Sequence, residues 1–324
     1  MEQRHIKQII VIVANAIDAT SRWAEYFGLC DWRIEKHFSN TQKYVTAIHV
    51  IGNREIVLLE PISGLQCFSE FLNQFREGYW GIVEEVEDAE SQAASFELEG
   101  YQRADQLLIG KRKLICFDTR EKLGLNISFV DTQDALCPNQ ENISIEDIHY
   151  TESVRSIKNP DERIICQIGI MVSNLQETLD NWVNTYLKGP WKVLTHSDKL
   201  FSGIVRKNGF IDQHFEYQIC MAMLGDIQIE IMMPVYGIPG YDRFMAHKNG
   251  AMHHMKEKLK NDELVEVICE YAYSEMNVLF GAHYFNANFY YPETQNKLGV
   301  QIELGNGEVA NSNTLLGYMY PKEQ

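Results

Sequence analysis

Two carboxylates of the sequence, Glu230 and Glu303, lie in apolar stretches that read Ile-Glu-Ile and Ile-Glu-Leu. A carboxylate that points into the core from such a stretch is costly unless a partner compensates its charge. A metal ion would compensate both charges, and an outward orientation of the side chains would also remove the cost. The adjacent His253 and His254 add imidazole groups, and because side chains alternate along a strand we expect only one ring to point inward. These residues predict either a metal site or side chains that face solvent.

The elements that would position these residues follow from an internal repeat, which decides the architecture before any local prediction does. Three ungapped registers pair Gln8 to Asn15 with Gln167 to Asn174, Trp23 with Trp182, Trp32 with Trp191, Pro61 with Pro234, Gly64 with Gly237, Phe71 with Phe244, and Lys122 to Gly124 with Lys297 to Gly299. We therefore predict a tandem duplication, with one module at 1–140, a linker at 141–160 and a second module at 161–324.

Inside each copy, the hydrophobic periods alternate in the order strand, helix and three strands, and this order occurs twice. In the first copy we expect strands near 8–13, 44–51, 55–59 and 82–86 and a helix at 88–98. In the second copy the matching strands are expected near 167–172, 215–224, 227–232 and 252–255, with a helix at 262–271. Helices would then cover one face of a mainly antiparallel sheet, so the predicted fold class is α+β.

Four stretches of the second copy resemble the metal-bearing strands of the vicinal oxygen chelate superfamily, which includes glyoxalase I, methylmalonyl-CoA epimerase, extradiol dioxygenases and the bleomycin- and fosfomycin-resistance proteins. They are Gln-Ile-Gly-Ile-Met-Val at 167–172, Ile-Glu-Ile-Met-Met-Pro at 229–234, Gly-Ala-Met-His-His-Met at 250–255 and Leu-Gly-Val-Gln-Ile-Glu-Leu at 298–304. The resemblance implies that each module is one cup-shaped, eight-stranded mixed sheet built from two strand-helix-three-strand units.

Carried over position by position, the resemblance places Gln167, Glu230, His254 and Glu303 at the four metal-ligand positions. An amide oxygen, an imidazole and two carboxylates suit Zn²⁺, Mn²⁺, Co²⁺, Ni²⁺ or Fe²⁺. Gln at the first position resembles the ligand set of animal glyoxalase I, and it argues against the two-His-one-carboxylate set of iron dioxygenases. A hydrogen bond to a neighbouring strand is the alternative role for Gln167.

The first copy has Gln8, Val57, Gly81 and Ser128 at the same four positions. Only the amide is retained, and such a set does not hold a divalent ion. We therefore expect a degenerate first module without metal and one divalent metal ion in the second.

The leading functional hypothesis is a metal-dependent isomerase or lyase of glyoxalase or epimerase type that moves a proton next to a carbonyl group. By resemblance, Glu303 is the expected base and Glu230 is the second candidate. The alternative is a non-catalytic small-molecule-binding protein of the bleomycin-resistance kind. A second alternative, an extradiol-type dioxygenase, would require Fe²⁺ and a second histidine ligand, for which His253 and His214 are the candidates.

Two features depart from the family pattern. Lys256 would point inward with His254 and meet a carboxylate or a substrate anion, unless the strand ends at Met255 and the following lysines are solvated. The segment 280–291 is rich in aromatic residues, which would either narrow the pocket for a flat or apolar substrate or pack in the core.

The composition excludes several function classes. The chain has 29 Lys and Arg against 45 Asp and Glu, and its formal charge of −16 disfavours nucleic acid and anionic lipid as partners. No apolar run approaches the roughly 18 residues of a membrane span. Seven cysteines without a CxxC pair are typical of a reducing compartment. We therefore expect a cytoplasmic protein with a small-molecule substrate, and a homodimer stays open.

Overall fold

The computed structural model describes residues 4–110, 112–132, 143–156, 162–206, 214–237, 241, 244–246, 250–307 and 317–321. The chain divides into two compact units. The first unit comprises Met1–Glu121, Leu125–Asp161 and Lys297–Val300, and the second comprises Lys122–Gly124, Glu162–Asn296 and Gln301–Gln324.

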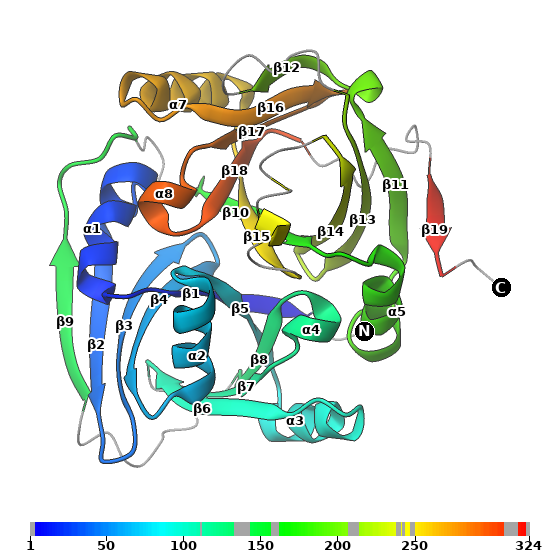
Figure 1. The fold of residues 1–324 in the computed structure, drawn as a ribbon. Coiled ribbons are helices and arrows are strands. Elements are labelled where there is room, and N and C mark those ends of the chain that lie inside the picture. Colours follow the sequence, from blue (N-terminus) through cyan, green and yellow to red (C-terminus); the bar gives the residue numbers. More distant parts are fainter. Residues whose placement is uncertain are drawn as a thin grey trace. The chain divides into compact units, whose positions relative to one another are not determined.

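The first unit is built on one curled mixed sheet with the strand order β6-β7-β8-β5-β1-β4-β3-β2-β9 (Figure 1). In chain order, its elements are β1 (His5–Ile12), α1 (Ala16–Phe27), β2 (Asp31–Phe38), β3 (Lys43–Ile51), β4 (Arg54–Ser63), α2 (Gln66–Phe75), β5 (Gly78–Val86), α3 (Ala89–Leu98), β6 (Arg103–Ile109), β7 (Arg112–Phe117), α4 (Arg120–Leu123), β8 (Asn126–Asp131) and β9 (Ile143–His149). The strand β9 lies within the segment 141–160 that the sequence predicts as a linker, and it pairs with β2 to form the edge of the sheet.

The second unit repeats this plan with the order β12-β16-β17-β18-β15-β10-β14-β13-β11-β19. Its elements are β10 (Ile164–Met171), α5 (Leu175–Thr185), β11 (Trp191–Ser197), β12 (Ser202–Arg206), β13 (Glu216–Leu224), β14 (Ile227–Tyr236), β15 (Ala251–Lys258), α7 (Asn261–Tyr273), β16 (Val278–Tyr284), β17 (Ala287–Pro292), α8 (Gln295–Leu298), β18 (Gln301–Gly305) and β19 (Tyr318–Tyr320). The predicted α+β class and the twice-repeated strand-helix-three-strand order are confirmed. The two sheets have nine and ten strands where eight were expected in each, and the additional strands, β9, β12 and β19, lie at sheet edges.

Strand register establishes which residues of the two units are equivalent. In the first unit, Ile10 lies opposite Gly81 on β5 and Val57 on β4. In the second unit, Gly169 lies opposite His254 on β15 and Glu230 on β14. The antiparallel pairs β1–β5 and β10–β15 are also irregular at corresponding positions, before Gln8 and before Gln167. The repeat alignment drawn from the sequence is therefore the structural alignment of the two sheets.

The first helix of each unit begins in the same way. The side chains of Asn15 and Asn174 accept hydrogen bonds from the backbone N–H three residues later, which satisfies donors that have no partner inside the helix. The buried Trp23 and Trp182 then anchor these helices against their sheets, each in an edge-to-face contact with the tryptophan of the following strand.

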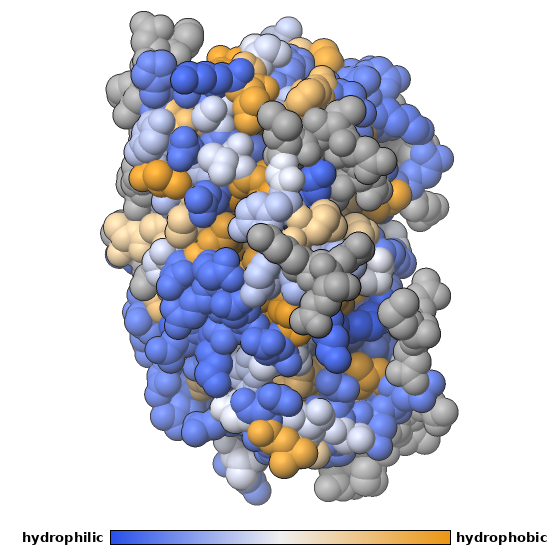
Figure 2. All heavy atoms as spheres, turned by 90° about the vertical axis from the view of Figure 1, so that its right-hand side faces the viewer, coloured by the Kyte–Doolittle hydropathy of each residue, from blue (hydrophilic) through white to orange (hydrophobic). Residues whose placement is uncertain are grey.

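The face drawn in Figure 2 is mostly hydrophilic, with apolar residues scattered among charged ones. Such scattering is ordinary for a water-exposed surface. None of the described helices has the length and apolar character needed to cross a bilayer.

A duplicated ion pair also joins the start of each unit to its central strand. Arg163 donates to both carboxylate oxygens of Glu257, at 2.7 and 3.1 Å, and Arg4 contacts Glu84 in the same way at 2.5 and 2.6 Å. The side chain of Arg163 is 7% exposed, whereas that of Arg4 is 28% exposed. Loss of the carboxylate therefore leaves a more deeply buried charge in the second unit.

We predict that Glu257→Gln lowers the free energy of unfolding by about 3 kcal/mol, because the buried Arg163 guanidinium loses the negative charge that it pairs with. The matched variant Glu84→Gln should cost less, since water reaches Arg4. Urea unfolding followed by tryptophan fluorescence measures both. Equal losses in the two variants would contradict the assignment of the cost to burial.

Candidate metal centre

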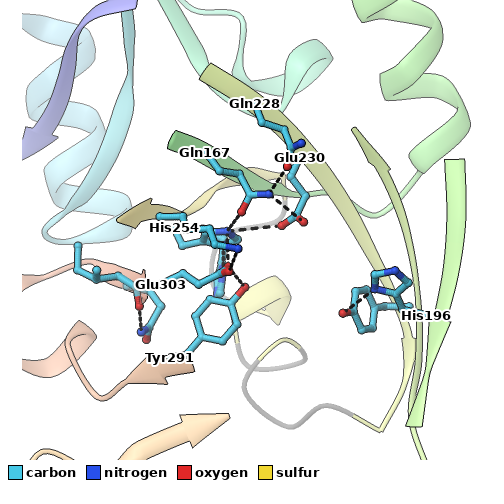
Figure 3. A network of polar contacts seen from close by, with 12 residues as sticks. Gln167, His196, Gln228, Glu230, His254, Tyr291 and Glu303 are labelled. Carbon is cyan, nitrogen blue, oxygen red and sulfur yellow. Dashed lines mark hydrogen bonds and ion pairs between the residues drawn. The ribbon is translucent and has the colours of Figure 1, made fainter. Parts of the chain in front are cut away.

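The four residues predicted as metal ligands converge from four neighbouring strands, β10, β14, β15 and β18 (Figure 3). The Nε2 atom of His254 lies 3.0 Å from Glu303 Oε2, 3.5 Å from Glu230 Oε2 and 3.5 Å from Gln167 Oε1. All four side chains are buried. The ligand atoms of the two glutamates and the histidine lie within 4.8 Å of one another.

These separations fit the coordination sphere of a divalent ion. With metal–ligand bonds of about 2.1 Å, adjacent donor atoms lie about 3.0 Å apart in an octahedron and about 3.4 Å apart in a tetrahedron. The observed contacts of His254 Nε2, 3.0 to 3.5 Å, fall in that range. Two carboxylates also neutralise a divalent charge, so both the geometry and the chemistry of the donors suit such an ion.

The amide of Gln167 is held with its oxygen toward this centre. Its Nε2 donates to Gln228 Oε1 at 2.5 Å and to Glu230 Oε1 at 3.4 Å, both on β14. The interstrand hydrogen bond that was the alternative role of Gln167 is therefore present. It occupies the nitrogen and leaves Oε1 facing His254, so the two roles are compatible.

The imidazole of His254 fits only because Gly169 has no side chain. A Cβ atom at Gly169 would lie 2.0 Å from His254 Cε1 and 2.4 Å from Nε2. The neighbouring His253 is also buried, against Tyr241 and Phe244. Its Nδ1 lies 3.0 Å from His254 Nδ1, so one of these two nitrogens carries a proton. A proton on His254 Nδ1 leaves the Nε2 lone pair free for a metal ion.

Three side chains contact the carboxylate of Glu303. Lys256 Nζ lies 2.8 Å from Oε1, while Tyr291 OH donates to Oε2 at 2.5 Å and His254 Nε2 contacts the same oxygen. Burial alone would raise the pKa of Glu303, but the charges and hydrogen bonds of Lys256 and His254 outweigh it and hold the pKa below its ordinary value. Glu303 is therefore kept ionised.

The position of Lys256 corrects one of the sequence alternatives. The strand does not end at Met255 with solvated lysines, because β15 continues to Lys258 and Lys256 is only 4% exposed. The charge of Glu303 draws the ammonium group inward.

Glu230 is held less tightly than Glu303. Its contacts to Gln167 and His254 are 3.4 and 3.5 Å long. Burial raises the pKa of Glu230 to about 7, with the negative charge of Glu303 adding to the rise and His254 and Lys256 opposing it. The two carboxylates therefore differ in their affinity for a proton.

The centre opens into a pocket of ≈ 420 Å³, part of which is open solvent. Six aromatic side chains line it: Phe201, Tyr217, Tyr241, Tyr284, Phe289 and Tyr291. The last three come from the aromatic segment 280–291, whereas Phe285 of that segment is 64% exposed. Sequence patterns assign no functional role to Phe201, Tyr217, Tyr241 or to His196, which also lines the pocket. The repeat would have drawn attention to His196 and Tyr217, because they align with His37 and Tyr44.

The equivalent point of the first unit is filled differently. Ile10 and Gly81 occupy the positions of Gly169 and His254. The bulky side chain therefore comes from β1 in the first unit, whereas in the second unit it comes from β15. Ser128 lies opposite Val83, as Glu303 lies opposite Lys256.

Comparison with solved structures shows what the fold is similar to. The chain is similar to a triple mutant of 4-hydroxymandelate synthase from Streptomyces coelicolor, with a TM-score of 0.61 and 11% identity over 95% of this chain and 93% of that one. It is also similar to a fusion of a xylose isomerase-like TIM barrel with a 4-hydroxyphenylpyruvate dioxygenase, with a TM-score of 0.52 and 11% identity over 95% of this chain and 49% of that one. No protein-family model matches the sequence, and no curated protein is similar to it.

These likenesses confirm that the chain has a tandem fold of the vicinal-oxygen-chelate type. At 11% identity they establish the fold alone. The neighbours are named for a synthase and a dioxygenase, so they are nearer to the dioxygenase alternative than to the isomerase or lyase hypothesis.

We predict one tightly bound divalent ion per chain, lost in His254→Ala and retained in the first-unit control His37→Ala. Elemental analysis after loading and dialysis measures the ratio. Two equivalents, or one that survives His254→Ala, would place the metal elsewhere.

We further predict that Gly169→Ala weakens metal affinity by roughly tenfold or more, because the new methyl group displaces the His254 ring. The matched control is Gly81→Ala, whose Cβ would lie 2.0 Å from the Asn126 carbonyl oxygen in the first unit. The control should lower stability and leave the metal affinity of folded protein unchanged. Calorimetric titration with Zn²⁺ compares the two variants, and unaltered affinity in Gly169→Ala would show that the ring is not a ligand.

Proposed function

We propose that the second unit binds one divalent metal ion and transfers a proton on the carbon next to a carbonyl group of a small substrate. The observation that carries this proposal is the convergence of four donors from four strands on one point that opens into the pocket. A bound divalent ion would polarise the carbonyl oxygen and stabilise the negative charge that develops on it.

The number of donors favours proton transfer over oxygen chemistry. With Gln167, Glu230, His254 and Glu303 as ligands, an octahedral ion keeps two open positions, which suffice for two neighbouring oxygens of a substrate. A dioxygenase that holds such a substrate and O₂ together would need three positions.

Glu230 is the better candidate for the group that moves the proton. Glu303 already accepts hydrogen bonds from Tyr291 and pairs with Lys256, so its oxygens are engaged. Glu230 has only the longer contacts described above, so its carboxylate is freer than that of Glu303 to take a proton from a substrate. We therefore assign the base to Glu230 and an orienting role to Glu303, the reverse of the order that the family resemblance implies.

Lys256, Tyr291 and Tyr241 complete the site. The ammonium of Lys256 fixes one oxygen of Glu303 and offsets the charge of the second carboxylate. The rings of Tyr291 and Tyr241 are buried beside the His253–His254 pair, where they exclude water from the reacting carbon.

A dioxygenase is the second candidate, and the likeness to 4-hydroxyphenylpyruvate dioxygenase favours it. It would need Glu230 to leave the metal, so that Gln167, His254 and Glu303 keep three positions open. Neither histidine considered as a second ligand suits that role. His253 Nδ1 contacts His254 Nδ1 at 3.0 Å, and the His214 side chain is 75% exposed and pairs with Asp198.

The test uses the full chain loaded separately with Zn²⁺, Mn²⁺, Co²⁺ or Fe²⁺. Deuterium exchange of 2-hydroxyacetophenone in D₂O reports proton transfer, and an oxygen electrode with 4-hydroxyphenylpyruvate and Fe²⁺ reports dioxygenase activity. Exchange without oxygen uptake supports the proposal, while oxygen uptake favours the second candidate. Metal binding with neither reaction would favour the non-catalytic binding protein.

We predict that Glu230→Gln keeps the metal and lowers deuterium exchange by ~10²-fold, the usual scale for loss of a positioned base. Glu303→Gln should instead weaken metal affinity, because it removes an ionised ligand and leaves the Lys256 charge without its partner. Exchange rates are measured at saturating metal. If Glu303→Gln abolished exchange with the metal still bound and Glu230→Gln did not, the two roles would be reversed.

A further inference from the structure

The candidate metal centre contains one charged side chain that is not a metal ligand. Lys256 follows His254 by two residues on β15, so the two side chains point to the same face of the sheet. Lys256 is 4% exposed, and its Nζ atom lies 2.8 Å from Glu303 Oε1. A lysine ammonium group has three donors and no lone pair. Lys256 can therefore act on a metal ion only through the carboxylate that it contacts.

The two oxygens of the Glu303 carboxylate have different partners. Oε1 pairs with Lys256, whereas Oε2 lies 3.0 Å from His254 Nε2 and accepts a hydrogen bond from Tyr291 OH at 2.5 Å (Figure 3). His254 Nε2 is the atom around which the other ligand atoms gather. Oε2 is thus the oxygen on the metal side of the carboxylate, and Oε1 is the oxygen on the ammonium side.

A glycine makes room for the lysine side chain. A Cβ atom at Gly305 would lie 2.6 Å from Lys256 Cε and 3.1 Å from Nζ. Gly305 follows Glu303 by two residues on β18, so the two positions share one face of the strand. The first unit replaces the lysine, its carboxylate partner and this glycine, and the equivalent residues there are Val83, Ser128 and Val130. All three residues therefore differ in the unit that lacks the metal-binding side chains.

We propose that Lys256 is a positioning residue that restricts Glu303 to one metal-binding oxygen. A carboxylate can bind a metal ion through one oxygen or through both. Binding through both would require Oε1 to leave Lys256, and the buried ammonium group would then lose the charge that it pairs with. Glu303 therefore supplies one donor, and the fourfold protein donor set leaves two positions of an octahedral ion open.

The inference rests on the proposed metal-dependent function and deepens it, because it names the residue that keeps the second position open. A metal site that acts on a substrate must keep such positions free of protein ligands. The role of Lys256 is then to preserve space on the ion, in addition to balancing the charge of the carboxylates.

The test counts the water molecules on Mn²⁺ bound to the full chain. Electron paramagnetic resonance in ¹⁷O-labelled water gives this count, because each coordinated water broadens the Mn²⁺ signal. With four protein donors around an octahedral ion, we expect two waters in the wild-type chain. In Lys256→Met, Oε1 of Glu303 becomes free to bind the ion, so we expect one of the two waters to be lost.

Tyr291→Phe is the matched control, because it removes a contact from the same carboxylate at the other oxygen, Oε2. Lys256 still holds Oε1 in this variant, so both waters should remain. The count distinguishes positioning from a structural or charge-balancing role, since neither of those roles changes the number of waters on the ion. Metal affinity does not distinguish them, because loss of a nearby positive charge strengthens cation binding by itself.

The outcomes separate this inference from the proposed function. Two waters in Lys256→Met, or fewer than two in the wild-type chain, would overturn the inference and leave metal binding intact. The wild-type count decides the matter even where Lys256→Met does not fold. Equal loss of water in Tyr291→Phe would also overturn it, because any loosening of Glu303 would then have the same effect.

The proposed chemistry can fail while the inference holds. Two waters in the wild-type chain and one in Lys256→Met, without deuterium exchange of the substrate, would support the role of Lys256 and count against proton transfer. If the wild-type chain binds no divalent ion, the proposed function fails and the inference fails with it.

Discussion

The buried negative charge of Glu230 and Glu303 is the constraint on which the second unit depends. Two carboxylates in the middle of an apolar sheet are tolerated only with compensation on every side. Lys256 and Tyr291 supply it for Glu303, and the imidazole of His254 lies between both carboxylates. Even so, burial and mutual repulsion raise the pKa of Glu230, so the compensation is incomplete without a further positive charge. A divalent ion would supply that charge at the point where the donor atoms already converge.

The first unit shows what the same scaffold looks like when this constraint is released. There the central strands keep their pairing and their irregularities, yet Val57, Gly81 and Ser128 stand where the second unit has two carboxylates and an imidazole. Ile10 and Gly81 stand at the positions of Gly169 and His254, with the large and small members exchanged between the two paired strands. The two copies thus differ at the centre by a few side chains rather than by backbone. An anchoring tryptophan, an Asn helix cap and an Arg–Glu ion pair remain common to both.

Much of this could be predicted from the sequence, because the repeat fixes register and register fixes which side chains share a face. The family resemblance supplied the four ligand positions, and the observed register brings them together. The sequence left the orientation of Lys256 open, because a run of charges is usually solvated, and the contact with Glu303 shows that this one points inward. The strand β9 was not predicted either, because most of its residues are exposed and burial does not alternate along it.

The four donor strands, β18, β15, β10 and β14, are contiguous and occupy the middle of the ten-stranded sheet. The pocket walls, in contrast, come partly from strands nearer the margins, such as β11, β16 and β17. The strands that exceed the repeated plan, β9, β12 and β19, also lie at the margins of their sheets. Such an arrangement separates the choice of ligand from the chemistry. Substitutions or insertions in the flanking strands would reshape the pocket without displacing the four donor positions at the centre.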